Sequence, residues 1–426
     1  MTETIFALAT APGRAGVAVV RVSGPRARSS VERLTGPLPA RGRGLRWVRS
    51  PDGEKLDQAL VLTFPEGASF TGEEVVELHL HGAPAVVRAV LAALGQIDGL
   101  RHAEPGEFTR RAFQSGRMDL AEVEGLSDLL QAESEAQRRL AMRSFDGATS
   151  RLVENLRRDL VRAAALIEAT IDFADEEVPE DVGPEVQALL DGLISRMQAE
   201  VQGAAAAEMI RDGFEVAIVG PPNAGKSTLI NYLAGREAAI TSEIAGTTRD
   251  VIEVRMEIAG QLVTVLDTAG LRETEDQVER IGVERARTRA EAADIRLHLL
   301  AGPDAAPEIA VQPGDLVLLA KDDDGTRGGI SGRTGAGVDR LLAALSEELE
   351  RRVAPARATT TARQAQAMAR AMDGLLKARD LLVTAETADL AAEELNEAMR
   401  ALDSLTGRID VEDKLDLIFS SFCIGK

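Results

Sequence analysis

One short segment restricts the folds open to this chain more than any other feature. Residues 220–227 read GPPNAGKS, which fits the pattern G-x-x-x-x-G-K-S, and an apolar run at residues 214–219 comes directly before them. A strand, a glycine-rich turn and a helix in this order form a loop whose backbone N–H groups surround phosphates. Lys226 would place its charge on the β- and γ-phosphates, and Ser227 would offer a hydroxyl to Mg²⁺. The sequence therefore predicts a nucleoside triphosphate site in an α/β domain.

Two polar segments follow in the order expected of a nucleotide switch. Residues 267–270 read DTAG and come directly after an apolar run at 262–266, so they lie at the end of a predicted strand. An aspartate there can hold the Mg²⁺ shell, and the N–H of Gly270 can reach the γ-phosphate. Between the two motifs, residues 246–250 read GTTRD and form a polar loop. Its Thr248 is the candidate second hydroxyl ligand of Mg²⁺.

The predicted base-recognition segment departs from its usual pattern at one position. A strand is expected at residues 316–319, and AKDD follows where guanine-specific enzymes usually carry N-K-x-D. Asp323 would accept hydrogen bonds from the N1–H and N2–H₂ edge of guanine, and Lys321 fits the pattern. Ala320 stands where Asn is expected, and losing such a hydrogen bond costs about 1–3 kcal/mol. We expect guanine preference to persist through Asp323, with weaker nucleotide binding.

The pattern of apolar residues divides the chain into blocks. Residues 1–117 are typical of a mixed α/β domain, 118–211 of helices, 212–350 of alternating strands and helices, and 351–426 of helices again. The economical arrangement is a multidomain α/β protein. In it an N-terminal α+β domain precedes a discontinuous helical domain, which is interrupted by an inserted P-loop domain of the Ras-like kind.

Particular elements can be assigned from residue spacing. Alternation in residues 75–80 places Val76, Leu78 and Leu80 on one face of a strand, and Glu77 on the other. Further strands are expected at 17–22 and 58–64, and a helix at 84–94. Two apolar stripes at steps of three and four predict long helices, one through Leu152, Leu156, Leu160, Ala163, Ile167 and Ile171, the other through Leu395, Met399, Leu402, Leu405 and Ile409.

Composition excludes several classes of protein. With 69 acidic and 49 basic residues the formal charge is −20, so any nucleic acid would be bound through a local patch or a partner. Aromatic residues make up only 3%, which argues against base stacking as the main device. The single cysteine, Cys423, cannot form an internal disulfide and fits a reducing compartment. No apolar run reaches the ~18 residues of a membrane span, and the first residues lack signal-peptide features, so we expect a cytoplasmic protein.

The usual groups that activate a hydrolytic water are missing. Leu271 stands directly after D-x-x-G, where many such enzymes carry Gln, and a leucine cannot orient water. No arginine finger is evident in the sequence. Glu279, in the acidic stretch that follows, is a candidate, although the residues alone favour a solvated helix position for it. A different catalytic arrangement is therefore expected.

Taken together, these motifs resemble the MnmE (TrmE) family of tRNA modification GTPases over essentially the whole chain. The similar segments are PGRAGVAVVRVSG at 12–24, TGEEVVELHLHG at 71–82, PGEFTRRAF at 105–113, GRMDLAEVEG at 116–125, GPPNAGKST from 220, IAGTTRD from 244, DTAGLRET from 267 and FCIGK at 422–426. The last segment is the most distinctive. The resemblance implies a folate-binding-like N-terminal domain, a helical domain and an inserted G domain.

The resemblance also implies potassium-dependent hydrolysis. Asn223 matches the potassium ligand of the family, and Ser242, Ile244 and Thr247 match the loop that completes the K⁺ site. A monovalent cation beside the transferred phosphoryl group can replace an arginine finger. Glu279 matches the water-orienting glutamate of the family. In the family, two G domains meet across their switch regions with K⁺ in place, and this contact triggers hydrolysis.

We accordingly expect GTP and Mg²⁺ to be held by the phosphate loop, the switch segments and two base-contact loops. The expected Mg²⁺ ligands are Ser227 and Thr248. The expected GTP-binding residues are Asn223, Ala224, Gly225, Lys226, Ser227, Thr228, Ser242, Glu243, Ile244, Ala245, Gly246, Thr247, Thr248, Asp267, Thr268, Ala269, Gly270, Lys321, Asp323, Ser331, Gly332 and Arg333.

A one-carbon folate site is implied as well. Arg21, Glu77, Arg117 and Lys426 match the positions that bind a donor such as 5-formyl-tetrahydrofolate, although the residues alone favour surface positions for the first two. Cys423 matches a candidate nucleophile toward C6 of the wobble uridine. A cysteine in so apolar a stretch is otherwise more often a small buried hydrophobe, and both interpretations stay open.

The leading hypothesis is a cytosolic GTPase acting with a flavin (FAD) protein of the MnmG type, in a heterotetramer. It would add a carboxymethylaminomethyl or aminomethyl group to C5 of the wobble uridine of certain tRNAs, with the folate supplying one carbon. Its N-terminal domain should form a homodimer. The alternative is a ribosome-assembly-type GTPase switch, which would need neither the N-terminal half nor the C-terminal tail. A folate-binding protein with a degenerate nucleotide site is a third interpretation, raised by Ala320.

Overall fold

The computed structural model describes residues 3–172, 183–236, 253–267, 287–382, 387–409, 415, 418–420, 422 and 425. The chain is a multidomain α/β protein, and it divides into two compact units. One unit comprises Met1–Ser127 and Leu402–Lys426, and the other comprises Asp128–Ala401. The domain boundaries at residues 117, 211 and 350 stay predictions.

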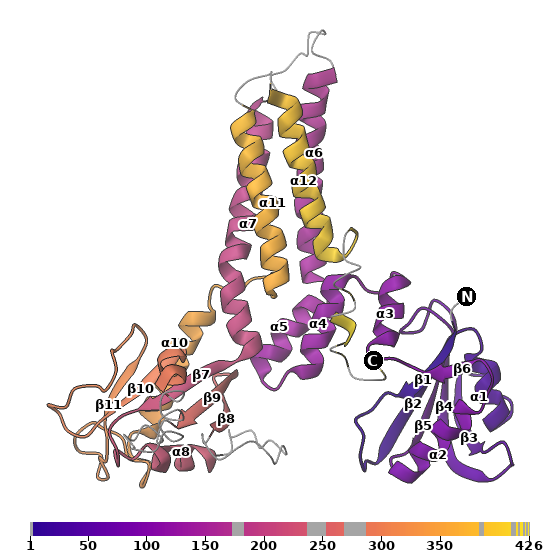
Figure 1. The fold of residues 1–426 in the computed structure, drawn as a ribbon, viewed down its shortest axis with the longest axis horizontal. Coiled ribbons are helices and arrows are strands. Elements are labelled where there is room, and N and C mark those ends of the chain that lie inside the picture. Colours follow the sequence, from indigo (N-terminus) through magenta and orange to yellow (C-terminus); the bar gives the residue numbers. More distant parts are fainter. Residues whose placement is uncertain are drawn as a thin grey trace, which may run out of the picture. The chain divides into compact units, whose positions relative to one another are not determined.

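The first unit contains a six-stranded sheet in the order β3-β4-β5-β2-β1-β6 (Figure 1). All neighbouring strands are antiparallel except β1 and β6, which are parallel. The strands are β1 (Thr4–Leu8), β2 (Val17–Ser23), β3 (Arg43–Arg49), β4 (Lys55–Phe64), β5 (Val75–His81) and β6 (Leu100–His102). Three of them confirm the strands predicted at 17–22, 58–64 and 75–80.

Two helices cover one face of this sheet, α1 (Ala27–Thr35) and α2 (Pro84–Gly95). The second confirms the helix predicted at 84–94. On β5 the side chains of Val76, Leu78 and Leu80 are buried in the core beneath the helices, as the alternation predicts. The other face of β5, with Glu77, therefore belongs to the side of the sheet that these helices leave open.

The end of the chain packs on the short helix α3 (Glu107–Gln114), which follows β6. The ring of Phe419 is fully buried, with its centroid 6.3 Å from that of Phe113. At Gly106 the Phe419 carbonyl comes so close that a Cβ would lie 2.3 Å from it. The described part of the tail is thus an integral piece of the first unit.

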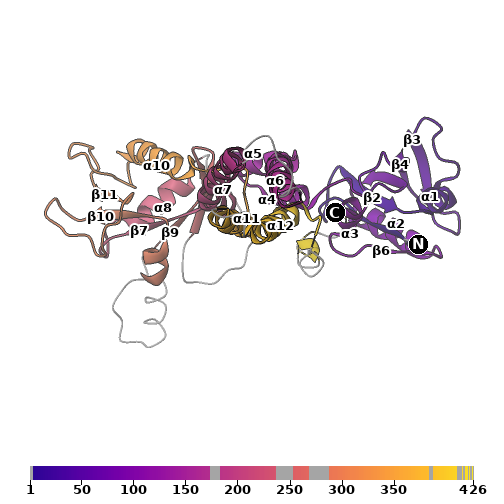
Figure 2. The ribbon, with the colours of Figure 1, turned by 90° about the horizontal axis from the view of Figure 1, so that it is seen from above.

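The second unit holds long helices packed side by side, seen nearly end-on in Figure 2. They are α5 (Glu135–Phe145), α6 (Ala148–Asp172), α7 (Gly183–Asp212), α11 (Ala362–Leu381) and α12 (Ala388–Thr406). The helices α12 and α4 (Leu120–Gln131) each contain residues of both units. No helix among the described residues is long and apolar enough to cross a bilayer.

The two predicted stripes are largely confirmed. In α6, Leu156, Leu160, Ala163 and Ile167 are buried, whereas Leu152 is half-buried and Val153 lies in the core instead; the side chain of Ile171 is outside the described residues. In α12, Leu395, Leu402 and Leu405 are buried, but the core position near Met399 is filled by Ala398. The stripe was wrong at Ile409, which is 38% exposed because the helix ends at Thr406.

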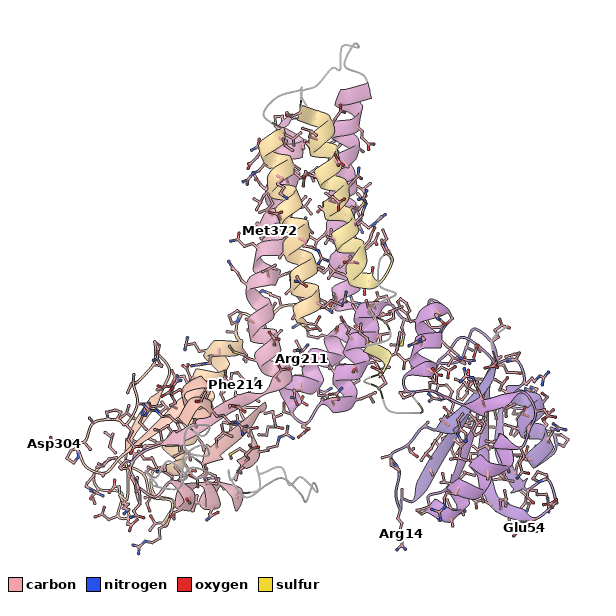
Figure 3. All side chains as sticks on the ribbon, in the orientation of Figure 1. Arg14, Glu54, Arg211, Phe214, Asp304 and Met372 are labelled. Carbon is pink, nitrogen blue, oxygen red and sulfur yellow. The ribbon has the colours of Figure 1, made fainter. Side chains whose placement is uncertain are left out.

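The inserted block is a five-stranded sheet in the order β11-β10-β7-β9-β8. It is parallel throughout except for the hairpin of β8 and β9. Its strands are β7 (Phe214–Val219), β8 (Glu253–Ile258), β9 (Gln261–Asp267), β10 (Ile295–Leu300) and β11 (Leu316–Leu319), and its helices include α8 (Lys226–Ala234) and α10 (Val338–Val353). Figure 3 labels Arg211 and Phe214, where α7 passes into β7.

Candidate functional site

The phosphate loop connects β7 to α8 at the carboxyl edge of the parallel strands. Gly220 adopts φ +158°, and a Cβ there would lie 2.5 Å from the Leu299 carbonyl oxygen, so only glycine fits. Gly225, at the N-cap of α8, and Asn223 adopt left-handed backbone conformations, with φ +101° and +61°. Such alternation turns successive N–H groups toward one concavity, which suits an anion.

The charged and hydroxyl groups expected around the phosphates lie at this same edge. Lys226 is buried, and its ammonium group donates to the carbonyls of Gly220 and Pro221. Asp267 is also buried. It is the last residue of β9 and pairs with Ile218, near the end of the neighbouring strand β7. Ser227 is half-buried in the first turn of α8. Oxygen groups of this kind are the ligands that Mg²⁺ prefers.

A pocket of about 210 Å³ joins this loop to the predicted base-contact loops. It brings together eight of the residues expected to bind GTP and also contains Ala320. Its lining is Ala224, Gly225, Thr228, Leu229, Leu299, Ala320, Lys321, Asp323, Ile330, Ser331, Gly332 and Arg333. Segments about a hundred residues apart in the chain therefore line one shared cavity, as a nucleotide site requires.

Asp323 is held in this pocket by two neighbours. One carboxylate oxygen accepts a hydrogen bond from the hydroxyl of Ser331 at 2.6 Å, and the other lies 2.6 Å from a guanidinium nitrogen of Arg333. Arg333 is largely exposed, with 74% of its side-chain surface accessible. The carboxylate thus has one internal partner and one solvent-facing partner that a ligand could displace.

Position 332 requires glycine for a steric reason that the sequence pattern does not show. A Cβ at this position would lie 2.5 Å from the backbone nitrogen of Leu229 in α8. The loop containing Ser331 and Arg333 consequently rests directly on the helix that follows the phosphate loop. An alanine, which is commoner in such loops, would not fit here without a backbone shift.

Sequence reasoning missed Asp322. Its side chain has no exposed surface, and its carboxylate accepts hydrogen bonds from the backbone N–H groups of Arg327 and Gly329. The sequence AKDD does not show that Asp322 is buried while Asp323 is partly exposed, because the burial of Asp322 depends on how the following loop folds back over it.

Several expected site residues lie outside the described residues, and for them the sequence predictions stand as they were. They are Ser242, Glu243, Ile244, Ala245, Gly246, Thr247, Thr248, Thr268, Ala269, Gly270, Glu279, Cys423 and Lys426.

In the first unit, Arg21 and Glu77 face each other across β2 and β5. Their side chains form an ion pair at 2.9 Å and are only 18% and 14% exposed, so they are more buried than the residues alone suggest. The Arg21 guanidinium lies 5.3 Å from the ring centroid of Phe70 and 5.5 Å from that of Phe108. A partly buried ion pair beside aromatic rings offers a flat heterocycle both stacking and hydrogen-bonding partners.

Arg117 belongs to the same neighbourhood through the segment at residues 67–72. It is exposed and donates to the carbonyl of Gly67 at 3.0 Å, while Phe70, in the same segment, lies against Arg21. The described tail residue Gly425 reaches β1, where a Cβ would lie 2.0 Å from the Leu8 carbonyl oxygen. The segment at residues 67–72 thus contacts both Arg117 and Arg21, and the folate set itself stays a prediction.

The histidines of β5 have carboxylate partners rather than a shared centre. His79 lies 3.2 Å from the carboxylate of Glu77, and His81 lies 2.7 Å from that of Asp57. Burial alone would raise the pKa of Asp57, but hydrogen bonds from the side chain and backbone of His81 and from the backbone of Gln58 outweigh it and hold the pKa below its usual value. Within the described ranges, no group of three His, Cys, Asp or Glu side chains is placed to hold a metal ion.

Comparison with known proteins gives a consistent result along the chain. Residues 4–117 match the family model described as GTP-binding protein TrmE N-terminus, and residues 120–423 match the model of the MnmE helical domain. Proteins named tRNA modification GTPase MnmE from Cereibacter sphaeroides and Ruegeria pomeroyi are 58% and 55% identical, and each alignment covers 100% of both chains. Era from Aquifex aeolicus, solved with GDP and AlF₄⁻, is 27% identical over 32% of this chain and 56% of its own, with a TM-score of 0.24.

Proposed function

This chain belongs to the MnmE family of tRNA modification GTPases, and we propose that it hydrolyses GTP to control the modification of C5 of the wobble uridine in certain tRNAs. The observation that carries the nucleotide part is the pocket in which the phosphate loop meets Asp323. The modification would be an aminomethyl or carboxymethylaminomethyl group. A tetrahydrofolate such as 5-formyl-tetrahydrofolate would donate one carbon, and GTP turnover would supply conformational control.

In the nucleotide site, each group has a distinct task. The N–H groups of the phosphate loop and Lys226 bind the β- and γ-phosphates, and Asp323 accepts from the N1–H and N2–H₂ groups of guanine. Ser227 and Thr248 would hold Mg²⁺, which neutralises charge on the phosphates when bound. The arrangement of Lys226 and Asp267 at one sheet edge supports this assignment.

For hydrolysis we propose a K⁺ site at Asn223, Ser242, Ile244 and Thr247, with Glu279 orienting the attacking water. Bound K⁺ would supply the positive charge that an arginine finger supplies elsewhere. Asn223 is exposed at the rim of the phosphate loop, in a left-handed backbone conformation, which supports its availability to a second G domain. Replacing K⁺ by Na⁺ should slow hydrolysis strongly, and insensitivity to the cation would remove Asn223 from this role.

For the carbon chemistry we propose that Arg21, Glu77, Arg117 and Lys426 bind the folate. The paired Arg21 and Glu77 suit the donors and acceptors of a pterin, and the exposed Arg117 suits the carboxylates of a glutamate tail. Cys423 is the candidate nucleophile toward C6 of uridine. The packing of the tail against α3, through Phe419, supports a role for the chain end in the same unit.

We further propose that the first unit forms a homodimer through the face of the sheet that α1 and α2 leave open. Large apolar side chains are exposed there, namely Leu45 at 62%, Trp47 at 43%, Leu60 at 39% and Val17 at 53%. Leu45 and Leu60 are cross-strand neighbours on β3 and β4, whereas Val17 lies two strands further along the sheet, opposite His81. A second copy would cover these side chains, as such patches usually require. An MnmG-type FAD protein would join the dimer in a cytoplasmic heterotetramer that receives the tRNA.

The decisive experiment is mass analysis of wobble uridines in cells that lack this protein. We expect unmodified uridines in the deletion strain, restoration by the wild-type gene and failure of Lys226→Ala to restore them. Fully modified uridines in the deletion strain, together with accumulated ribosomal precursors, would instead support the ribosome-assembly alternative. Removing the last four residues should abolish modification and leave GTP hydrolysis intact.

A further inference from the structure

The base pocket lacks the asparagine that usually precedes the lysine in guanine-specific loops, and the structure contains a candidate substitute. We propose that Asp322 and Arg327 form a clamp that positions Asp323 for guanine recognition in place of a side chain at Ala320. Ala320 is 4% exposed, lines the pocket and has only a methyl group to offer. This inference rests on the proposed role of the pocket as a guanine nucleotide site.

The first half of the clamp is the carboxylate of Asp322. It accepts a hydrogen bond from the N–H of Gly329 at 2.8 Å and another from the N–H of Arg327 at 3.1 Å. The backbone of Asp322 adds a third hydrogen bond, because its N–H donates to the Ile330 carbonyl at 3.1 Å. Hydrogen bonds from backbone N–H groups to a buried carboxylate are among the stronger ones, so they close the loop at residues 323–329 firmly.

The second half is the guanidinium of Arg327. It donates to the carbonyl of Lys321 at 2.6 Å and approaches the Asp322 carboxylate at 3.4 Å. Lys321 adopts φ +56°, a left-handed conformation that a non-glycine residue keeps only when its surroundings enforce it. Arg327 therefore fixes the peptide group between Lys321 and Asp322. By holding the backbone at this point, it also orients the side chain of the next residue, Asp323.

A close backbone contact shows that this loop is built to be tight. At Gly329 a Cβ would lie 2.4 Å from the Leu319 carbonyl oxygen and 3.0 Å from the Cβ of Asp322. The loop then continues directly into Ser331, which donates to Asp323 at 2.6 Å. The clamp thus acts on both sides of the guanine acceptor, through the peptide before it and through the loop that returns to Ser331.

The test is nucleotide discrimination by the purified full-length protein. Inosine nucleotides lack the 2-amino group of guanine, so the ratio of GTP to ITP affinity reports how well Asp323 is aligned. We expect Arg327→Ala to weaken GTP binding about tenfold, the effect of one hydrogen bond of ordinary strength, and to reduce the GTP-to-ITP ratio. A purely structural residue would lower both affinities together and leave the ratio unchanged.

The variants are chosen so that folding does not decide the outcome. The Arg327 side chain is 49% exposed, so its removal leaves the core intact, whereas Asp322→Asn tests the buried half. Arg351→Ala is the matched control. Arg351 is an exposed arginine on α10, in the same inserted block, and it pairs with Glu348 on the same helix. It should leave both affinities unchanged.

A rescue variant adds an independent check. Adding Ala320→Asn to Arg327→Ala should restore most of the lost GTP affinity and the GTP-to-ITP ratio, because the new amide supplies a second polar anchor. An unchanged ratio in Arg327→Ala, with clear guanine preference in the wild type, would overturn the clamp and leave the proposed function standing. A wild type that binds GTP and ATP equally would overturn both.

Discussion

The carboxylate of Glu107 makes the stability of the first unit depend on pH in a way that can be measured. Arg101 binds it through two hydrogen bonds of 2.7 and 2.8 Å, and Arg111 adds a third at 2.9 Å. Burial alone would raise the pKa of Glu107. Hydrogen bonds from Arg101, the backbone N–H of Glu104 and Arg111 outweigh burial and lower the pKa from 4.5 to about 2.

The sign follows from the lowered pKa. Since the folded pKa lies below the unfolded one, the carboxylate contributes stability above its ordinary pKa, and this contribution is lost as the pH falls toward 2. The shift corresponds to about 3 kcal/mol, of which roughly 2 kcal/mol would be gone by about pH 3. Glu107→Gln should therefore cost about 2–3 kcal/mol at neutral pH and about 1 kcal/mol at pH 3.

The assay uses the single tryptophan of the chain, Trp47, which lies in β3 of the same unit. Urea unfolding followed by its emission, at one fixed protein concentration for all variants, gives the apparent free energy of unfolding at each pH. Glu54→Gln is the control, because Glu54 is an exposed residue in the turn between β3 and β4, labelled in Figure 3, and its replacement should change stability by under about 0.5 kcal/mol at every pH. A difference between Glu107→Gln and wild type that stays constant from neutral pH to about pH 3 would refute the reasoning.

Three further changes test other parts of the structure. Gly332→Ala should weaken nucleotide binding roughly tenfold in calorimetric titration, because overpacking against α8 costs about 1–3 kcal/mol; unchanged affinity would mean that the loop is not fixed on the helix. Arg255→Ala removes a half-exposed ion pair with Glu133 and should shift the free energy of unfolding by less than about 1 kcal/mol; a larger loss in urea melts would contradict the expected screening. Asp315→Asn leaves the buried Arg296 without its carboxylate and should cost about 3–5 kcal/mol, read as a lower melting temperature; a variant as stable as wild type would count against that pairing.

The parts of the fold that the sequence predicts best are those set by neighbours along the chain. The phosphate loop can be recognised from the sequence because its strand, its two glycines and Lys226 all lie within about a dozen consecutive residues. The strand at 75–80 follows from strict alternation, since the spacing itself decides which side chains are buried. The end of the α12 stripe at Ile409 could not be predicted in the same way, because an apolar residue continues the period whether or not the helix does.

Contacts between distant segments set the features that the sequence left open. The burial of Arg21 depends on its pairing with Glu77 in another strand and on two aromatic rings from elsewhere in the unit. The need for glycine at position 332 comes from a helix about a hundred residues earlier. No local pattern encodes either relation, although each uses ordinary chemistry once the chain has brought the groups together.

Ala320 shows why a departure from a motif is weak grounds for predicting a lost function. A motif assigns a task to one residue type at one position, whereas the ordering of the guanine-contacting loop can also come from other side chains. In this chain the neighbouring Asp322 and the downstream Arg327 lie where they can provide this ordering, through hydrogen bonds to Gly329 and Lys321. Since the penalty for a misaligned acceptor is the same whichever side chain aligns it, an asparagine at position 320 should add to guanine affinity far less in the wild type than in the variant that lacks Arg327.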